Sequence, residues 1–174
     1  MQKSKSDLDI YLFCPRCSKN LVSKTIDKSV VKACENCGFI FWNNPIAVVS
    51  LLLHQDNKIL MLQRANQPFK NSWVLPGGFM NIDETSEDAI KREVKEETGL
   101  NVNVDGIIGV YRIDNDPRGI HIDIIYHGKL NGQTPTVSKE ATNWFLFSKD
   151  ELPKDIAYKH KNAIIDWVTK KGQY

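Results

Sequence analysis

The segment from Gly78 to Leu100 constrains the fold of this 174-residue chain more than any other part of its sequence. It follows the short apolar run Trp73–Leu75, and Gly99 stands near its end. Thr85 is a good helix N-cap, and glycine is the residue that most often follows a helix. The sequence therefore predicts a strand, a glycine turn, a loop and a capped helix.

Three glutamates of that predicted helix, Glu93, Glu96 and Glu97, are spaced three and four residues apart and share one face. Like charges at this spacing repel one another, by about 0.2–0.5 kcal/mol per pair on an exposed helix. Crowded carboxylates suit Mg²⁺ or Mn²⁺, and phosphate oxygens and water can complete the octahedron. Gly78 lets the backbone come close to an ion or phosphate, and its carbonyl could add a ligand. In isolation, a solvated helix held by salt bridges would be the alternative.

The same segment resembles a known family. It fits G-x5-E-x7-R-E-U-x-E-E-x-G-U, where U is aliphatic, at every fixed position, including Glu84, Arg92 and Gly99. This pattern is the Nudix box, and residues 45–172 resemble Nudix hydrolases. The resemblance implies an α/β/α sandwich around a mixed sheet, and hydrolysis of a nucleoside diphosphate linked to another group X.

The resemblance also implies roles for individual residues. Glu93 and Glu97 would be the principal ligands of a catalytic Mg²⁺ or Mn²⁺, with Glu96 and the Gly78 carbonyl as further ligands. Glu84 and Arg92 would form an ion pair between loop and helix. The base that activates water is not fixed in the family: it is Glu93 or a later loop glutamate, for which Glu140 is our candidate. A plain surface glutamate is an equally good interpretation of Glu140.

Substrate choice must come from outside the box. Arg64, Arg118 and Gly78 are candidate substrate-binding residues, because arginine presents a planar fork to phosphate oxygens; solvated surface arginines are the alternative. The turn at residues 115–119, with Pro117, resembles ADP-ribose pyrophosphatases, so we expect ADP-ribose to yield AMP and ribose 5-phosphate. FAD is the closest alternative. NADH pyrophosphatases are similar too, but their S-Q-P-W-P-F signature is absent. Pro117 also fits an ordinary turn.

All four cysteines lie in the first quarter of the chain, as the pairs Cys14/Cys17 and Cys34/Cys37 with 16 residues between the pairs. This spacing is typical of a four-thiolate zinc site. Two disulfides or free thiols are the alternatives, and a reducing compartment disfavours disulfides. A module of this size buries little apolar surface, so we expect structural Zn²⁺ to stabilise a zinc ribbon over residues 8–44. Residues 45–174 would form the Nudix hydrolase domain.

The remaining pattern predicts a mixed sheet between helices. Strands are expected at residues 25–27, 30–32, 46–54, 58–63, 73–75, 102–104, 107–113, 120–130 and 144–147, and helices at 85–98 and 155–170. The histidines show no paired ligand spacing, so we expect them on sheet or protein surfaces rather than on a metal. They are His54, His121, His127 and His160.

Composition excludes several classes of protein. At 41% hydrophobic residues the chain is too apolar to be disordered, and no apolar run is long enough for a membrane span or signal peptide. A net charge of +2 gives little reason to expect nucleic acid as a partner. We expect a cytoplasmic enzyme that acts on a small nucleotide, and leave a homodimer open. A second hypothesis is a regulator that senses a nucleotide and uses the zinc ribbon to bind a partner.

Overall fold

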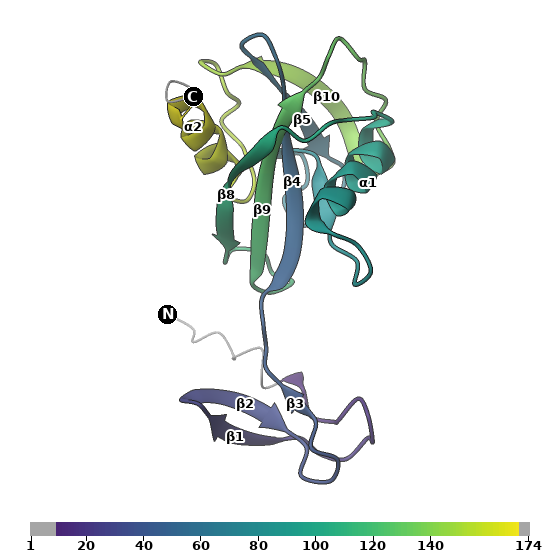
Figure 1. Ribbon diagram of the computed structural model, residues 1–174, viewed down its shortest axis with the longest axis vertical. Helices are drawn as coiled ribbons and strands as arrows, with labels where there is room; N and C mark the ends of the chain where they lie inside the picture. The colour runs from purple at the N-terminus through teal and green to yellow at the C-terminus, as the bar shows by residue number, and fades with distance from the viewer. Residues whose placement is uncertain (1–9, 171–174) are drawn as a thin grey trace. The chain divides into compact units, whose positions relative to one another are not determined.

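The computed structural model describes residues 10–170, which divide into two compact units after Pro45 (Figure 1). The predicted outer limits of the two domains, residues 8 and 174, lie outside the described residues. Among the helices of residues 10–170, none is long and apolar enough to cross a membrane.

The first unit is built around a three-stranded antiparallel sheet. Its strands are β1 (Val22–Ile26), β2 (Ser29–Ala33) and β3 (Ile40–Phe41), in the order β1-β2-β3. Its small core contains Cys14, Leu21 and Cys34, with Phe39 packed against them. Two of the three central core residues are thus cysteines, so the apolar contribution to this unit's stability is small.

The second unit contains a seven-stranded mixed sheet. Five strands form the order β10-β5-β4-β9-β8, namely β10 (Ala141–Ser148), β5 (Lys58–Arg64), β4 (Ile46–Gln55), β9 (His121–Lys129) and β8 (Gly106–Ile113). The short strands β6 (Trp73–Val74) and β7 (Gly77–Phe79) pair with β5 and β4. Among these seven strands, β4 and β9 pair in parallel and the other pairings are antiparallel. The predicted mixed sheet is confirmed.

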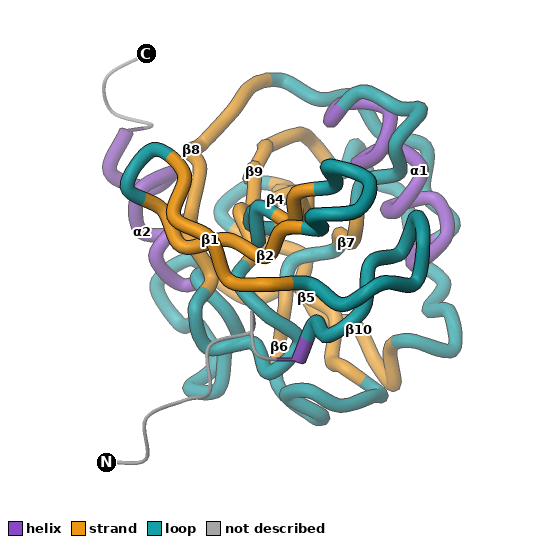
Figure 2. Tube along the Cα trace, turned by 90° about the horizontal axis from the view of Figure 1, so that it is seen from below, coloured by secondary structure: helices purple, strands orange, loops and turns teal. Residues whose placement is uncertain are grey.

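The two helices cover opposite faces of this sheet (Figures 1 and 2). On one face, α1 (Ser86–Thr98) packs Ile90 and Val94 against the odd-numbered side chains of β4, Leu51 among them. On the other face, α2 (His160–Lys170) packs Trp167 against Leu52. Alternate side chains of a strand point to opposite faces of its sheet. Because a helix covers each face here, β4 is apolar at nearly every position in its middle.

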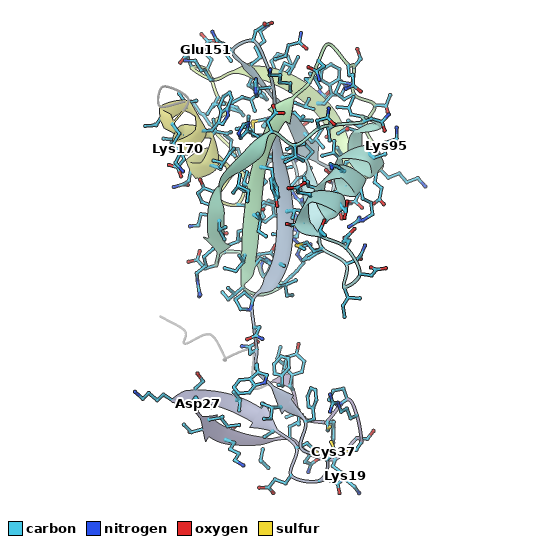
Figure 3. The ribbon with its side chains drawn as sticks, viewed as in Figure 1. Lys19, Asp27, Cys37, Lys95, Glu151 and Lys170 are labelled. Atoms are coloured by element: carbon cyan, nitrogen blue, oxygen red, sulfur yellow. The ribbon has the colours of Figure 1, made fainter. Side chains whose placement is uncertain are left out.

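The box helix begins and ends as its sequence predicts. The Thr85 hydroxyl accepts a hydrogen bond from the Asp88 N–H at 3.2 Å and donates one to the Asp88 carboxylate at 2.7 Å. Gly99 has φ of 72°, a left-handed conformation that costs glycine little, and its N–H bonds to the Lys95 carbonyl. Lys95 lies on the side of α1 away from the sheet (Figure 3), and its Nζ donates to the Gly99 carbonyl rather than to a box glutamate.

Two predictions of secondary structure were wrong. Residues 102–104 are not a strand, although the Asp105 N–H does bond to the His127 carbonyl just before β8. The last helix begins at His160 rather than residue 155. The residues expected to form its first turn instead lie alongside β6 and bond to it. The Trp73 N–H bonds to the Asp155 carbonyl, and the Ala157 N–H bonds to the Trp73 carbonyl. Sheet-edge hydrogen bonds replace the helical ones there.

Candidate active site and cysteine cluster

A cleft of about 270 Å³ opens beside α1 in the second unit. It is lined by parts of β4, β5, β7 and α1, and by loops from three later parts of the chain. The structure brings every residue proposed above for catalysis, substrate binding or the catalytic metal to this one cleft. They are Arg64, Gly78, Glu93, Glu96, Glu97, Arg118 and Glu140.

The glycine turn before α1 packs directly against the box glutamates. The Gly77 N–H donates a hydrogen bond to the Glu97 carboxylate at 2.8 Å. A Cβ added at Gly78 would clash with the Glu93 carboxylate, and one at Gly77 would clash with the Val49 carbonyl. Strand β7, which contains both glycines, can therefore lie between β4 and the helix only because it lacks side chains at these positions.

Arg92 links the loop to the helix through its whole guanidinium group. Its Nη2 and Nε lie 2.6 and 2.9 Å from the two carboxylate oxygens of Glu84, and Nη1 lies 2.8 Å from Glu93 Oε1. Nη1 is also 3.4 Å from Glu96, and Nη2 donates to the Phe79 carbonyl at 3.0 Å. The hydrogen bonds from Arg92, with that from the Asn81 N–H, lower the pKa of Glu84 to about 2. This network orients Glu93 and holds the loop.

The negative charges of Glu93 and Glu97 are not fully balanced by positive groups of the protein. Burial raises the pKa of Glu97 to about 8, with Glu93 and Glu140 adding to the effect and the Gly77 N–H opposing it. Burial also raises the pKa of Glu93, against the hydrogen bond and charge of Arg92. The crowded carboxylates of Glu93, Glu96 and Glu97 offer only oxygen atoms as metal ligands, and Mg²⁺ and Mn²⁺ prefer such ligands. A divalent cation would relieve their repulsion.

The candidate arginines are held at the cleft by other groups. Arg64 donates from Nε to the Pro68 carbonyl at 2.9 Å, and its guanidinium lies 5.5 Å from the ring centre of Tyr158. Arg118 forms a two-pronged pair with Asp116, its Nε lying 3.0 Å from Asp116 Oδ1 and its Nη2 lying 2.7 Å from Asp116 Oδ2. Both guanidinium groups therefore have fixed positions and still line the cleft.

Glu140 is exposed and lies in the loop before β10, yet it lines the same cleft as the box glutamates. Its backbone carbonyl accepts a hydrogen bond from the Ala65 N–H at 2.8 Å, which anchors this loop to the end of β5. Its charge contributes to the raised pKa of both Glu93 and Glu97. The position agrees better with a residue of the site than with an isolated surface glutamate.

A buried polar cluster forms the inner wall of the cleft. The Ser50 hydroxyl lies 3.0 Å from Asp123 Oδ2 and 3.2 Å from His160 Nε2. His160 Nδ1 accepts a hydrogen bond from the Leu75 N–H at 2.9 Å, so the ring proton belongs on Nε2. Within residues 10–170, Asp123 Oδ1 and His121 Nε2 are buried without a hydrogen-bond partner.

Two of the histidines expected on sheet or protein surfaces are almost fully buried: His121 lies on strand β9 of the sheet, whereas His160 lies on α2 and not on the sheet. His121 is 2% exposed and His160 is 3% exposed, and both line the cleft. Sequence reasoning also missed Asp116 and Asp123. One signal was available, because His121 and Asp123 are polar residues that alternate with isoleucines in the first half of β9, which indicates a polar patch on one face of the sheet.

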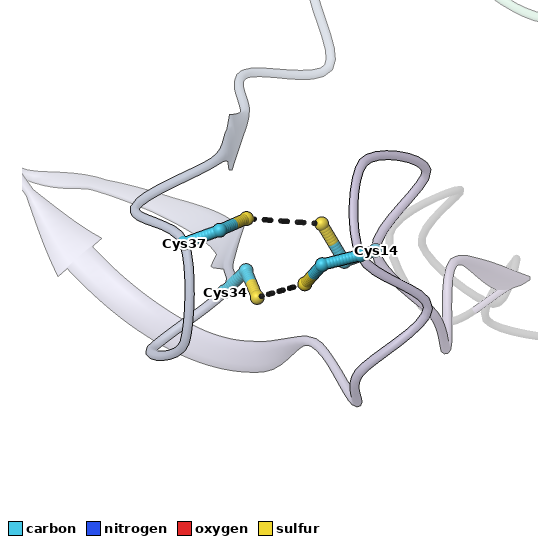
Figure 4. A group of neighbouring side chains, drawn as sticks. Cys14, Cys34 and Cys37 are labelled. Atoms are coloured by element: carbon cyan, nitrogen blue, oxygen red, sulfur yellow. Dashed lines mark hydrogen bonds between the residues drawn. The ribbon is translucent and has the colours of Figure 1, made fainter.

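The cysteines form a second cluster, in the first unit. Cys14 Sγ lies 3.5 Å from Cys37 Sγ, and Cys17 Sγ lies 3.4 Å from Cys34 Sγ (Figure 4). All four sulfurs are within 4.8 Å of one another, and none of the four forms a disulfide. A tetrahedral zinc ion with Zn–S bonds of about 2.3 Å holds its sulfurs about 3.8 Å apart. The donor set therefore fits Zn²⁺.

Both cysteine turns have the same backbone pattern. In each, the N–H of the first cysteine, Cys14 or Cys34, bonds to the carbonyl five residues later, and its carbonyl accepts from the N–H four residues later. The residue that donates this second bond is left-handed in both turns, Ser18 with φ of 59° and Gly38 with φ of 72°. Two equivalent turns thus present two sulfurs each to a common point.

Comparisons with known proteins agree with these sites. A family model described as the NUDIX domain matches residues 43–168. The ADP-ribose pyrophosphatase of Methanocaldococcus jannaschii is 37% identical over 154 residues, covering 88% of this chain and 90% of that protein. A putative 8-oxo-dGTP diphosphatase of Bacillus subtilis is 39% identical over 118 residues, covering 67% and 75%. The crystal structure of a NUDIX hydrolase from Nitrosomonas europaea has a TM-score of 0.79 at 25% identity and covers 92% of each chain.

Proposed function

Because this chain belongs to the Nudix family and is a Nudix pyrophosphohydrolase, we propose that its substrate is ADP-ribose, cleaved to AMP and ribose 5-phosphate. The observation that carries this choice is the 37% identity to an archaeal ADP-ribose pyrophosphatase over 88% of the chain. The turn at residues 115–119 agrees with it, since Arg118 in that turn lines the cleft next to the box glutamates.

The form of the cleft suits an elongated substrate with a diphosphate at its centre. A second cavity of about 200 Å³ shares Arg64, Glu97, Arg118 and Glu140 with the first, so the two cavities lie next to each other at the arginines. Arg64 and Arg118 would contact the diphosphate oxygens. A ribose has several hydroxyl groups, and these suit the polar wall that contains His121 and Asp123.

In this proposal, water attacks one phosphorus atom of the diphosphate. Its oxygen forms a new P–O bond, the bridging P–O bond breaks, and the two phosphates leave as AMP and ribose 5-phosphate. Glu93, Glu96, Glu97 and the Gly78 carbonyl would hold Mg²⁺ or Mn²⁺, which when bound neutralises charge on the transferring and leaving oxygens. Gly77 and Arg92 fix Glu97 and Glu93 by hydrogen bonds, so the ligands are oriented before substrate arrives.

The attacking water must give up a proton to a base in the cleft. Glu140 is our first candidate, because it lines the cleft and is not hydrogen-bonded through its side chain to Arg92, as Glu93 is. Glu93 is the alternative, and its raised pKa would make it a better proton acceptor than an ordinary glutamate. If Glu140 is the base, substitution Glu140→Gln should lower kcat strongly and change KM little.

We further propose that Cys14, Cys17, Cys34 and Cys37 hold a structural zinc ion, which makes residues 8–44 a zinc ribbon. A closed four-thiolate site has no open position for substrate, so this zinc takes no part in hydrolysis. A cytoplasmic location remains a prediction from the sequence, as does the homodimer left open above. Nothing in the sequence favours nucleic acid as the partner of the ribbon.

Comparing kcat/KM for ADP-ribose, FAD, NADH and 8-oxo-dGTP in saturating Mg²⁺ tests the substrate, because this ratio measures discrimination in the transition state. We expect ADP-ribose to exceed each of the others by at least about tenfold, or about 1.4 kcal/mol. A tenfold preference for another compound would remove ADP-ribose as principal substrate. Tight binding of ADP-ribose without any release of AMP would instead favour the nucleotide-sensing regulator.

A further inference from the structure

A third group of metal-ligating side chains lies in the second unit, apart from both sites described above. His54, Asp105 and His127 bring one donor atom each to within 4.8 Å of one another. They come from the end of β4, the residue before β8, and the end of β9. None of the three lines the cleft that contains the box glutamates.

The sheet itself places these side chains together. In the parallel pairing of β4 with β9, His127 lies opposite Leu52 and His54 lies opposite Lys129, so the two histidines are diagonal neighbours on one face. Asp105 is fixed by its N–H, which bonds to the His127 carbonyl at 2.9 Å. The convergence therefore rests on strand register rather than on a mobile loop.

Two neighbours leave room at this point and limit rotation of the rings. Gly106 pairs with His127 across the β8–β9 ladder, and a Cβ at Gly106 would lie 3.1 Å from His127 Nε2. A larger residue there would crowd the imidazole. On the other side, the His54 ring lies 4.9 Å from the ring of Trp167, which packs from α2.

The cluster opens into a cavity of about 540 Å³. Lys129 and Lys170 also line it, and their positive charges oppose a bare cation. The Lys170 ammonium group is fixed by a hydrogen bond from Nζ to the Ile108 carbonyl at 3.0 Å. Three protein ligands leave at least one position of a tetrahedral ion for water or an anion. An anion in that position would bring negative charge toward Lys129.

We propose that His54, Asp105 and His127 form a binding site for a divalent transition-metal ion of the Zn²⁺ type. Two imidazoles and one carboxylate suit Zn²⁺, Co²⁺, Ni²⁺ or Cu²⁺, whereas Mg²⁺ prefers oxygen ligands alone. Zn–N bonds of about 2.0–2.1 Å need donor atoms closer together than 4.8 Å. On binding, the exposed Asp105 side chain would move toward the imidazoles, and the rings would need only small shifts within the limits set by Gly106 and Trp167.

The test uses the full chain with its cysteine site loaded with zinc, and with saturating Mg²⁺ present to compete at the carboxylate site. Co²⁺ is added stepwise, and broadening of backbone amide signals is followed by ¹H–¹⁵N NMR. We expect signals near residues 54, 105 and 127 to broaden, with the weak visible absorption of a cobalt site that lacks thiolates. Broadening confined to the cysteine turns or to α1 would overturn the proposal.

Variants then assign the ligands. His127→Gln and Asp105→Asn should each raise the Co²⁺ concentration needed for half-maximal broadening by at least tenfold, and hydrolysis of ADP-ribose should be unchanged. Asp105 is exposed, so its variant keeps the fold even if His127→Gln does not. Glu151→Gln, a similar change at another exposed carboxylate, is the matched control and should leave the titration as it was. Equal titrations for wild type and Asp105→Asn would contradict the site.

Discussion

The two units of this protein differ in what holds them together. The described part of the first unit has a small core: Cys14, Leu21 and Cys34 form one cluster, and Val31 and Ala33 are its other buried apolar residues. The second unit has apolar clusters on both faces of its sheet, and fully buried residues such as Leu51 and Leu52 each contribute about 1.5–3 kcal/mol. We infer that a metal stabilises the fold of the first unit, while in the second unit a metal serves the chemistry.

The different roles inferred for the two metals follow from the parts of the fold that supply their ligands. In the first unit the sulfurs lie in two short turns that pack on Leu21 and Phe39, and a metal bound by all four sulfurs would link the two turns directly. In the second unit the carboxylates of Glu93 and Glu97 stand on a helix that Ile90 and Val94 already pack against the sheet. Loss of metal should therefore unfold one unit and only inactivate the other.

Substitution Glu97→Gln should have the largest effect, and it should act on hydrolysis rather than on the fold of the second unit. It removes a charge at nearly constant volume, so kcat for ADP-ribose should fall by about 100-fold or more, as when one preorganised electrostatic group is lost. Because burial raises the pKa of Glu97, an uncharged side chain should keep or raise Tm in metal-free protein. Steady-state kinetics and thermal unfolding measure the two effects.

Glu87→Gln is the matched control for that variant, since Glu87 lies exposed in the first turn of the same helix. It should change neither kcat nor Tm appreciably. If Glu97→Gln kept near-wild-type turnover, Glu97 would not be a ligand of the catalytic metal. The proposal that α1 supplies the metal ligands of the second unit would then be wrong.

The ion pair of Glu84 with Arg92 should give a smaller, pH-dependent effect on stability. The pKa of Glu84 is lowered to about 2, so its stabilising effect is present above the unfolded value near 4.5 and is lost as pH falls toward 2. Glu84→Gln should lower Tm at pH 6 by about 3 °C, a typical shift for one substitution in a chain of this size. The Tm difference between wild type and variant should narrow between pH 4.5 and 3.

Thermal unfolding of both proteins across this pH range measures the effect, with Glu151→Gln as a control at a carboxylate with no guanidinium partner among the described residues. A Tm difference that stays constant from pH 6 to pH 3 would show that the charge of Glu84 does not stabilise the loop.

The smallest effect is expected in the first unit, at the turn residue Ser18. Ser18 has φ of 59° where the equivalent turn has Gly38, and a left-handed conformation costs a non-glycine residue about 1–2 kcal/mol. Ser18→Gly should therefore slow the release of zinc to a coloured chelator by about fivefold, which corresponds to about 1 kcal/mol. Ser23→Gly, within strand β1, should speed release instead. Equal release rates for Ser18→Gly and wild type would contradict the turn equivalence.

The sequence predicted those parts of the fold and site that depend on local spacing. The capped helix, the pairs of cysteines separated by two residues and the apolar run of β4 all follow from residues that are close together in the chain. Local spacing also explains why Glu93, Glu96 and Glu97 were found. The start of α2 was wrong because hydrogen bonds to Trp73, far away in the sequence, outcompete the helical ones.

The polar wall of the cleft could not be predicted in the same way. Ser50, Asp123 and His160 belong to β4, β9 and α2, and they meet only because β4 and β9 pair in parallel with Ser50 opposite Ile125. No spacing along the chain encodes that register. The convergence of His54, Asp105 and His127 has the same origin, which is why the histidines showed no ligand pattern in the sequence.

Removal of zinc should separate a metal that stabilises the first unit from a metal that serves hydrolysis in the second. Hydrogen exchange is followed by mass spectrometry on the full chain, with and without a zinc-selective chelator, while Mg²⁺-dependent hydrolysis is assayed in parallel. We predict faster exchange across residues 10–45 only, with exchange in residues 46–170 and kcat nearly unchanged; Cys34→Ser should give the same pattern without chelator. Unchanged exchange in residues 10–45 after one zinc per chain has left, or faster exchange throughout both units, would contradict the account.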